Sequence, residues 1–228
     1  MRASKPPKVC IQDRNRNNRP RSIALLSGSM RETHHLSTTR PEKIRHSPDM
    51  DYQQIIDFWF LETESAQWWR QNDKFDRRIG ERFGVVLAQA AKCELYAWRA
   101  TPLGRLAEII VLDQFSRTIH RATALAFAND SLALALAQEA IAAHADEALD
   151  PAKKAFCYMP FMHSESPEIH AIAVTLFDQD GLDSYLQFEL RHQAIVERFG
   201  RYPHRNALLG RASSAEEIEF LKTPGSSF

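Results

Sequence analysis

Cysteine pairs and long apolar runs are scarce in this sequence. Its 228 residues include three cysteines, Cys10, Cys93 and Cys157, which are widely spaced and form no CxxC or Cys/His pairing. This pattern argues against a disulfide framework and a structural zinc site, and it favours reduced thiols in a cytoplasmic protein. No apolar run approaches the roughly 20 residues that span a bilayer, so we expect no membrane partner.

Alternating runs rich in Val, Ile and Thr, which are typical of strands, are also lacking. From Asp51 onward, apolar residues recur at spacings of three and four, the period of a helix with one buried face. We predict an all-α fold of about eight helices. The residues expected to begin or cap them are Asp73, Thr101, 129–131, Asp150, Ser166, Gly181 and Ser213, and the helix from Asp150 should end near residues 159–160.

Short turns between the expected helices predict antiparallel pairs that stack on one another. No fixed sequence period and no tetratricopeptide consensus accompany them. Any likeness to a helical repeat is therefore one of architecture alone, and the oligomeric state is not indicated.

Charge divides the chain into two unlike segments. Residues 1–49 hold 11 Lys/Arg and 4 Asp/Glu, a net charge of +7, and residues 50–228 balance it with −7. The first segment has few large apolar residues and predicts a disordered, basic N-terminal extension. Because no aromatic residue interleaves its charges, we do not expect it to bind nucleic acid. Met50 directly precedes the patterned region and is the expected start of the protein, with residues 50–228 as a single helical domain.

Two charged residues lie on an apolar helical stripe. Leu106, Ile110, Asp113 and Arg117 are spaced by four, three and four residues, so they share one face. One interpretation is a partly buried ion pair that locks two helices together. The other is a pocket in which Arg117 receives an anionic group while Asp113 orients it.

The segment 158–167 is a candidate site because it is rich in aromatic and polar residues but poor in turn formers. His163 and Glu165 fit an acid/base pair, or two metal ligands, of a hydrolase-type enzyme. Ser164 lies between them, but no GxSxG motif supports a nucleophile. The simpler interpretation is that these polar residues cap a helix that begins at Pro167.

A third polar segment, 198–206, gathers arginines and a histidine around a glycine and a proline. Such a turn could present His204, Arg205 and Asn206 to one phosphate or carboxylate. Arginines near the end of a helix also interact favourably with its dipole and then need no ligand. His192, on an apolar face just upstream, fits a hydrogen-bonded core residue.

No local signature of a metal or a cofactor is present. His163, His192, His204 and Glu165 could assemble two histidines and a carboxylate, but there is no HExxH or comparable spacing. The sequence therefore predicts neither a metal site nor a cofactor.

Read together, these segments resemble a known bacterial family, domain of unknown function 924, described as having a tetratricopeptide-like helical fold. The resemblance covers residues 51–228 and rests on FWF at 58–60, WW at 68–69, GRLAEIIVLDQFSR at 104–117, YMPFMHSE at 158–165, RFGRYPHRN at 198–206, LGR at 209–211 and PGSSF at 224–228. It departs at Ser116, where proline is frequent, and at Met162, where a longer polar residue is usual. It implies the fold and the domain limits but no activity.

The resembling segments are also those in which polar residues interrupt apolar stripes, which suggests convergence in one groove. The candidate binding residues are Asp113, Gln114, Arg117, His163, Glu165, His204, Arg205 and Asn206. The leading hypothesis is a protein that binds an anionic small molecule or peptide, with Arg117, Arg205 and His204 as the receiving groups. The alternatives are a hydrolase that uses His163 and Glu165, with or without a metal ion, and a protein–protein scaffold that docks through Trp68 and Trp69.

Overall fold

The computed structural model describes residues 50–227, and this part of the chain contains helices and turns without any strand. The predicted all-α fold is confirmed. The expected N-terminal extension lies outside the described residues. The α-helices are α1 Tyr52–Asp57, α2 Asp73–Ala90, α3 Pro102–Ile110, α4 Ser116–Ile119, α5 Asp130–Ala142, α6 Pro151–Met162, α7 Pro167–Phe177, α8 Asp183–Phe199 and α9 Ala215–Phe220.

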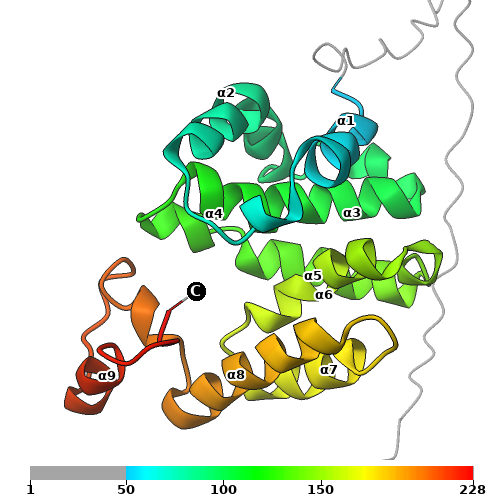
Figure 1. Ribbon diagram of the computed structural model, residues 1–228. Coiled ribbons are helices and arrows are strands. Elements are labelled where there is room, and N and C mark those ends of the chain that lie inside the picture. Colours follow the sequence, from blue (N-terminus) through cyan, green and yellow to red (C-terminus); the bar gives the residue numbers. More distant parts are fainter. Residues whose placement is uncertain (1–49, 228) are drawn as a thin grey trace, which may run out of the picture. The chain divides into compact units, whose positions relative to one another are not determined.

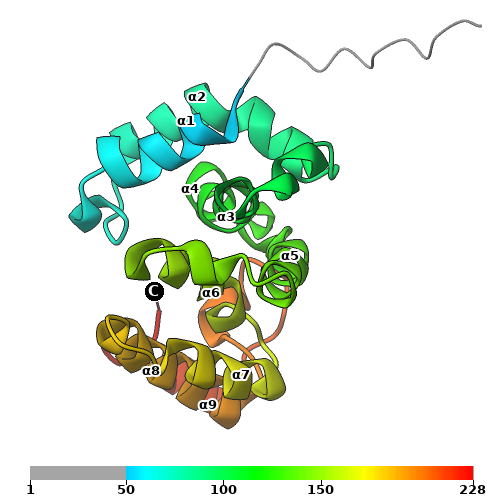
Figure 2. The same ribbon diagram turned by 90° about the vertical axis from the view of Figure 1, so that its right-hand side faces the viewer.

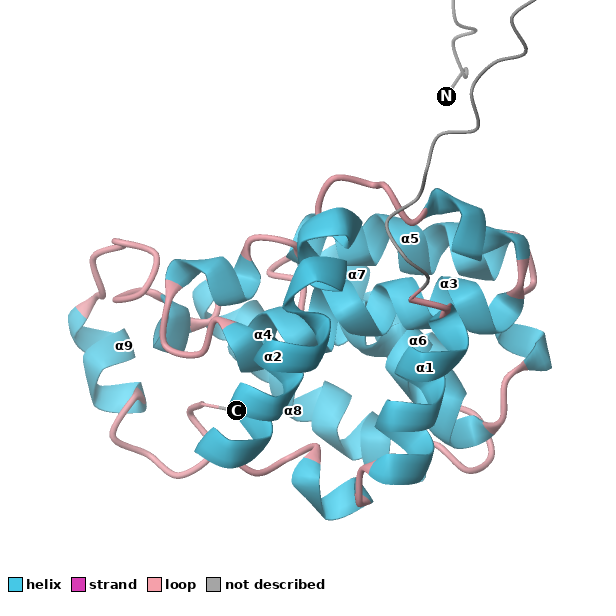
Figure 3. Ribbon diagram, turned by 90° about the horizontal axis from the view of Figure 1, so that it is seen from above, coloured by secondary structure: helices cyan, strands magenta, loops and turns pink. Residues whose placement is uncertain are grey.

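Helices stack largely in chain order, so that neighbours in sequence are neighbours in space. α1 packs on α3 and α2 on α4; α3 packs on α5 and α6; α6 packs on α7, and α7 on α8. Figures 1 and 2 show α3 and α6 in the middle of this stack, with α1 and α2 beyond one side and α7 and α8 beyond the other. Seen from above, α9 lies at one end of the described region (Figure 3). No helix among the described residues has the length and apolar character that crossing a membrane requires.

Cap residues in the sequence set several of the helix ends. Thr101 and Asp150 each accept a backbone N–H from the first turn of their helix, and each is followed by a proline. A proline is well placed there because its fixed φ suits the first turn and its missing N–H would have no helical partner. Gly200 ends α8 at φ +67°, a conformation that glycine adopts without strain.

The predicted end of α6 near residues 159–160 is wrong. The helix continues through Pro160 to Met162, although a proline removes one helical hydrogen bond. Phe161 and Met162 are both buried in the core beyond it. Burial of such side chains stabilises by about 1.5–3 kcal/mol each and offsets that loss.

Two predicted caps are shifted by one residue. Asn72, and not Asp73, caps α2 through its side-chain oxygen. The capping box at α9 joins Ser214 to Glu217, whereas the sequence pattern suggested Ser213. In both cases adjacent side chains have the same capping chemistry, and only the backbone shows which one precedes the first helical turn.

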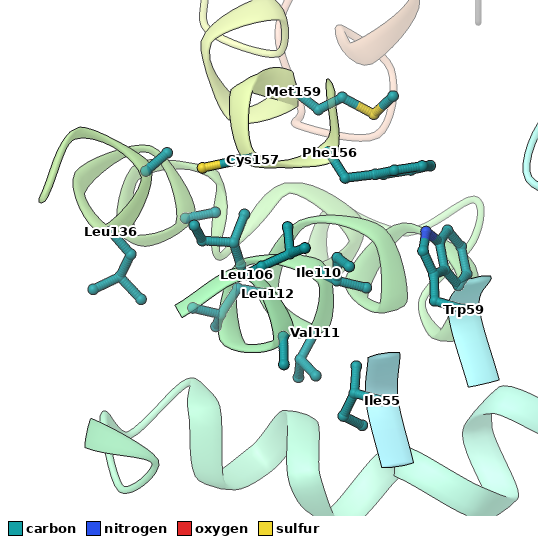
Figure 4. Close-up of a cluster of buried hydrophobic side chains, with 14 of the residues drawn as sticks. Ile55, Trp59, Leu106, Ile110, Val111, Leu112, Leu136, Phe156, Cys157 and Met159 are labelled. Carbon is teal, nitrogen blue, oxygen red and sulfur yellow. The ribbon is translucent and has the colours of Figure 1, made fainter. Parts of the chain in front are cut away.

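The core is apolar, and its side chains pack against two opposite sides of α3. Figure 4 shows side chains of α3 and the turn after it lying between those of the first helical segment and those of α5 and α6. The labelled members are Ile55, Trp59, Leu106, Ile110, Val111, Leu112, Leu136, Phe156, Cys157 and Met159. A polar group that enters this region must therefore bring its own partners.

Candidate functional site

Asp113 is one of the charged groups buried in the described part of the chain. It lies in a π-helical turn, Val111–Phe115, which joins α3 to α4 and widens the helix locally. Single π turns of this kind frequently occur at functional sites. The side chain has no exposed surface. Its Oδ1 lies 3.0 Å from Nη1 of Arg117 and 2.7 Å from Nδ1 of His163, and its Oδ2 accepts the Gln114 amide at 2.6 Å.

These contacts determine the charge of Asp113. Burial alone raises the pKa of the carboxyl group, but the positive charge of Arg117 and the hydrogen bonds from His163 and Gln114 outweigh it. The pKa is therefore held well below the usual range of an aspartate. At neutral pH the site contains a fully ionised, buried carboxylate.

Asp130 supplies a second carboxylate, at the first residue of α5. Its two oxygens accept both terminal nitrogens of Arg117, at 2.9 and 3.0 Å. One of them also accepts Nη1 of Arg205 at 3.2 Å. Asp130 thus joins α4 to the C-terminal 3-10 turn Pro203–Arg205, across a wide separation in sequence.

His163 caps the C-terminal end of α6 and turns its ring toward Asp113. Burial, together with the charge of Arg117, lowers the pKa of the imidazole below its ordinary value. The ring is therefore neutral at pH 7. Because the Asp113 carboxylate can only accept, we assign the ring proton to Nδ1, which leaves a lone pair on Nε2. Nε2 makes no hydrogen bond within residues 50–227.

A small hollow opens beside His163, with a volume of about 250 Å³. The start of α5, the end of α6, the loop after it and the 3-10 turn form its walls. The lining residues, which define the hollow from here on, are Phe127, Asp130, Ser131, Leu134, Pro160, His163, Ser164, Glu165, Arg205 and Leu209. Ligand pockets commonly exceed about 300 Å³, so this one suits a small molecule or the end of a peptide.

Arg205 is the cation in this wall, and its guanidinium is held on several sides. It lies between the rings of Phe127 and Tyr202, at 4.7 and 4.5 Å from their centroids. Its Nη2 donates to the carbonyl oxygen of His163 at 3.1 Å. Burial and the nearby charge of Arg117 lower its pKa. Its Nε–H is buried and has no acceptor among the described residues.

Glu165 does not pair with His163, so the acid/base pair that the sequence offered as an alternative does not form between these two residues. Its carboxylate accepts two bonds from Arg211, at 2.6 and 2.9 Å, and the backbone N–H of Tyr202 at 2.8 Å. Although burial opposes it, these donors lower the pKa of Glu165. Asp113, in the π-helical turn that follows α3, takes the place beside His163.

The other two candidates of the C-terminal segment do not line the hollow. Asn206 has no exposed surface, donates to Ser213 at 3.0 Å and accepts Nε of Arg211 at 3.0 Å. His204 is half-buried, with its ring 5.6 Å from that of Tyr202, and burial lowers its pKa to about 4. Both residues support the segment that carries Arg205.

A histidine and a glutamate form a second pair, which is buried next to the loop that joins α6 to α7. His170 of α7 and Glu189 of α8 are fully buried, with Nδ1 and Oε1 2.6 Å apart. The other nitrogen of His170 lies 2.9 Å from the carbonyl oxygen of Ser164 and 3.2 Å from the hydroxyl of Tyr202. Through the contact with Ser164, this pair helps to fix the position of the loop between α6 and α7.

The structure thus joins five of the eight candidates into one connected network: Asp113, Gln114, Arg117, His163 and Arg205. Glu165 lines the same hollow with a partner of its own. Sequence reasoning missed Asp130, whose place at a helix start suggested only a cap, and Arg211, which occurred only within the family motif. Arg117 does not line the hollow, and two carboxylates engage its guanidinium.

Metal ligation finds no support in the described part of the chain. No group of three or more His, Cys, Asp or Glu side chains there is arranged to hold a metal ion. Cys157 is buried, and burial raises the pKa of its thiol to about 12, which keeps it protonated and unsuited to ligation.

The tryptophan pair is only half exposed. Trp69 retains 57% of its surface, whereas Trp68 is half-buried and its indole N–H donates to the carbonyl oxygen of Trp59 at 3.0 Å. Trp69 also stacks on Phe156 and Phe188. Docking through this pair stays a prediction.

The stacked helices and the network of carboxylates, imidazole and guanidinium define an all-α protein with a polar site between its helices. The family model for bacterial proteins of unknown function, DUF924, matches residues 55–225, and the chain belongs to this family. The solved structure of a protein of unknown function from Agrobacterium tumefaciens is similar at 36% identity and a TM-score of 0.72, covering 75% of this chain and 96% of that one. A search of curated proteins finds no match.

Proposed function

We propose that the hollow binds a small anionic group, the carboxylate or phosphate of a metabolite or of a peptide end. The observation that carries the proposal is Arg205, a buried guanidinium in the wall of the hollow whose Nε–H lacks an acceptor among residues 50–227. Leaving such a donor unpaired is costly, and native structures rarely do so without a reason. An anion in the hollow would balance the charge of this guanidinium and offer it a further acceptor.

His163 would strengthen this binding as the pH falls. Its neutral ring offers only a lone pair at Nε2, but a bound anion favours the protonated form, whose Nε2–H can then donate. Arg117 would act indirectly, since it holds the Asp130 carboxylate that positions Arg205. Gln114, His204 and Asn206 would support these groups from outside the hollow.

Calorimetric titration and thermal shift of the full chain test the proposal. The probes are inorganic phosphate, acetate, glutarate and a short acidic peptide at millimolar concentration. Arg205→Gln should weaken binding by about 10-fold or more, the effect of losing a charge-assisted hydrogen bond. The matched control is Arg198→Gln, an arginine in an exposed pair with Glu216, which should leave binding unchanged.

Two results would contradict the proposal. One is the absence of stabilisation by any of the anions. The other is binding that Arg205→Gln and Arg198→Gln weaken equally, because general surface charge would then explain it. Binding that tightens between pH 7 and 5.5, and loses this pH dependence in His163→Gln, would support the role given to the imidazole.

A further inference from the structure

The pair of Asp113 and His163 has the geometry of a general base held ready for use. A catalytic histidine needs one ring nitrogen fixed by an acceptor and the other free to take a proton from a reacting group. Nδ1 of His163 lies 2.7 Å from the Asp113 carboxylate, which has no exposed surface. The His163 side chain keeps 16% of its surface exposed and His163 lines the hollow. Because Nδ1 is turned to Asp113, we assign this exposure to the opposite edge of the ring, which carries Nε2.

The charge states match this role. Arg117 contacts Asp113 at 3.0 Å and keeps the carboxylate ionised, so the proton stays on Nδ1 of His163. The same guanidinium and burial disfavour the charged imidazole, so Nε2 keeps its lone pair at neutral pH. A structural ion pair would require the opposite state, with a proton on each nitrogen.

Two hydroxyl groups line the hollow, but neither is engaged by His163. Ser164 accepts the backbone N–H of Ser166 at 3.1 Å, and Ser131 makes no side-chain bond to the imidazole among the described residues. The nucleophile that fits this arrangement is therefore a water molecule. Arg205, which also lines the hollow, is the group that can hold negative charge on a substrate.

We infer that the Asp113–His163 pair hydrolyses a small ester that carries an anionic group and is bound in the hollow. This inference rests on the proposed anion binding and adds a reaction to it. Nε2 takes a proton from water as the water oxygen bonds to the ester carbonyl carbon, and the π electrons move to the carbonyl oxygen. The C–O bond to the leaving group then breaks, and the imidazolium returns its proton to the leaving oxygen. One water is consumed, and a carboxylic acid and an alcohol are formed.

Two chromogenic esters test the reaction with the full chain: neutral para-nitrophenyl acetate and the anionic mono-para-nitrophenyl ester of glutaric acid. We expect turnover of both, with a higher kcat/KM for the anionic ester. His163→Gln should lower kcat by about 100-fold to 10,000-fold, the range for removing a general base. The rate should rise with pH through the lowered pKa of His163 and then level off.

His144→Gln is the matched control. His144 also pairs with a carboxylate through Nδ1, at 2.9 Å from Glu147, but both side chains are exposed and lie outside the hollow. Its kinetics should equal those of the unaltered protein. Asp113→Asn should lower kcat strongly with little change in KM. If Asp113→Asn does not fold, His163→Gln carries the test, provided that its circular dichroism and melting curve are unchanged.

The outcomes separate this inference from the proposed function. Anion binding without hydrolysis of either ester above the rate of His163→Gln would overturn the inference and leave the binding proposal standing. A different outcome is turnover that depends on His163 without any anion binding and without preference for the anionic ester. It would contradict the proposed function and support the role of His163 as a general base. Equal rates in His163→Gln and His144→Gln would also overturn the inference.

Discussion

Two histidine–carboxylate pairs lie close together in this protein, and they differ in what the second ring nitrogen of the histidine contacts. His163 and Asp113 are 2.7 Å apart, and His170 and Glu189 are 2.6 Å apart. Both nitrogens of His170 have acceptors within the protein, and the pair has no exposed surface. In His163, Nδ1 contacts the Asp113 carboxylate, whereas Nε2 has no hydrogen-bond partner among residues 50–227, and the residue lines the hollow.

Burial and pairing alone therefore do not identify a reactive site. A sealed pair of this kind joins α7 to α8 and supports the loop through the Ser164 carbonyl. A pair that is open on one side can exchange a proton with a ligand. Removing a carboxylate from each pair should therefore have different consequences, mainly for stability in one case and mainly for chemistry in the other.

The largest effect on stability should follow Glu189→Ala, in the sealed pair. It leaves the His170 ring in the core without its acceptor and opens a cavity, which should lower the free energy of unfolding by about 3–5 kcal/mol. Urea denaturation followed by circular dichroism measures this. A loss below about 1 kcal/mol would show that the pair is not a structural anchor.

The next largest effect concerns Asp113 and the stability of the fold at acid pH. A carboxyl group with a lowered pKa stabilises the fold above its unfolded pKa, near 4, and that contribution disappears as the pH falls toward its folded value. Its size should be on the order of 2–3 kcal/mol for an ion-paired, buried aspartate. Asp113→Asn should therefore lose less stability than the unaltered protein between pH 4 and 2. Parallel pH curves of the two proteins would contradict the assignment.

Some of the contacts of Asp113 can be predicted from the sequence and others cannot. Spacing places Asp113 and Arg117 on one face, because residues four apart on a helix are neighbours. The same local rules predict the caps at Thr101 and Asp150. The partner of His163 could not be predicted in this way, because it lies 50 residues away in the chain.

Sequence reasoning paired His163 with Glu165, its neighbour in the chain, although the chain turns there and directs the two side chains to different partners. Asp130 was overlooked for a related reason, since an acidic residue at a helix start has a sufficient local explanation. Only the stacking of α4, α5 and the C-terminal turn shows that it binds two arginines. Helix formation is a local property of the chain, whereas the site depends on contacts between distant segments.

A third effect on stability involves His192 of α8. Burial lowers its pKa to about 3, so the unfolded chain binds its proton before the folded one does. Stability should therefore be full above pH 6.5 and decline below it, by about 1.4 kcal/mol per pH unit for this group. His192→Gln should flatten the stability curve between pH 6.5 and 5, as measured by urea titrations. An unchanged slope would contradict the neutral, buried state.

The smallest effect should come from the exposed pair of His144 and Glu147. Their side chains retain 76% and 71% of their surface, so water screens the interaction. Glu147→Ala should change the free energy of unfolding by about 0–1 kcal/mol. A loss in the free energy of unfolding as large as that of Glu189→Ala would show that the burial of a histidine–carboxylate pair does not determine its contribution to stability.

Nitrogen NMR of the imidazole rings in the full chain tests most directly whether His163 presents an unprotonated Nε2 to the hollow. The His163 signals, assigned by their loss in His163→Gln, should show a neutral ring at pH 7 with the proton on Nδ1, and the ring should titrate below its ordinary pKa. A proton on Nε2, or a positively charged ring at pH 7, would contradict the account.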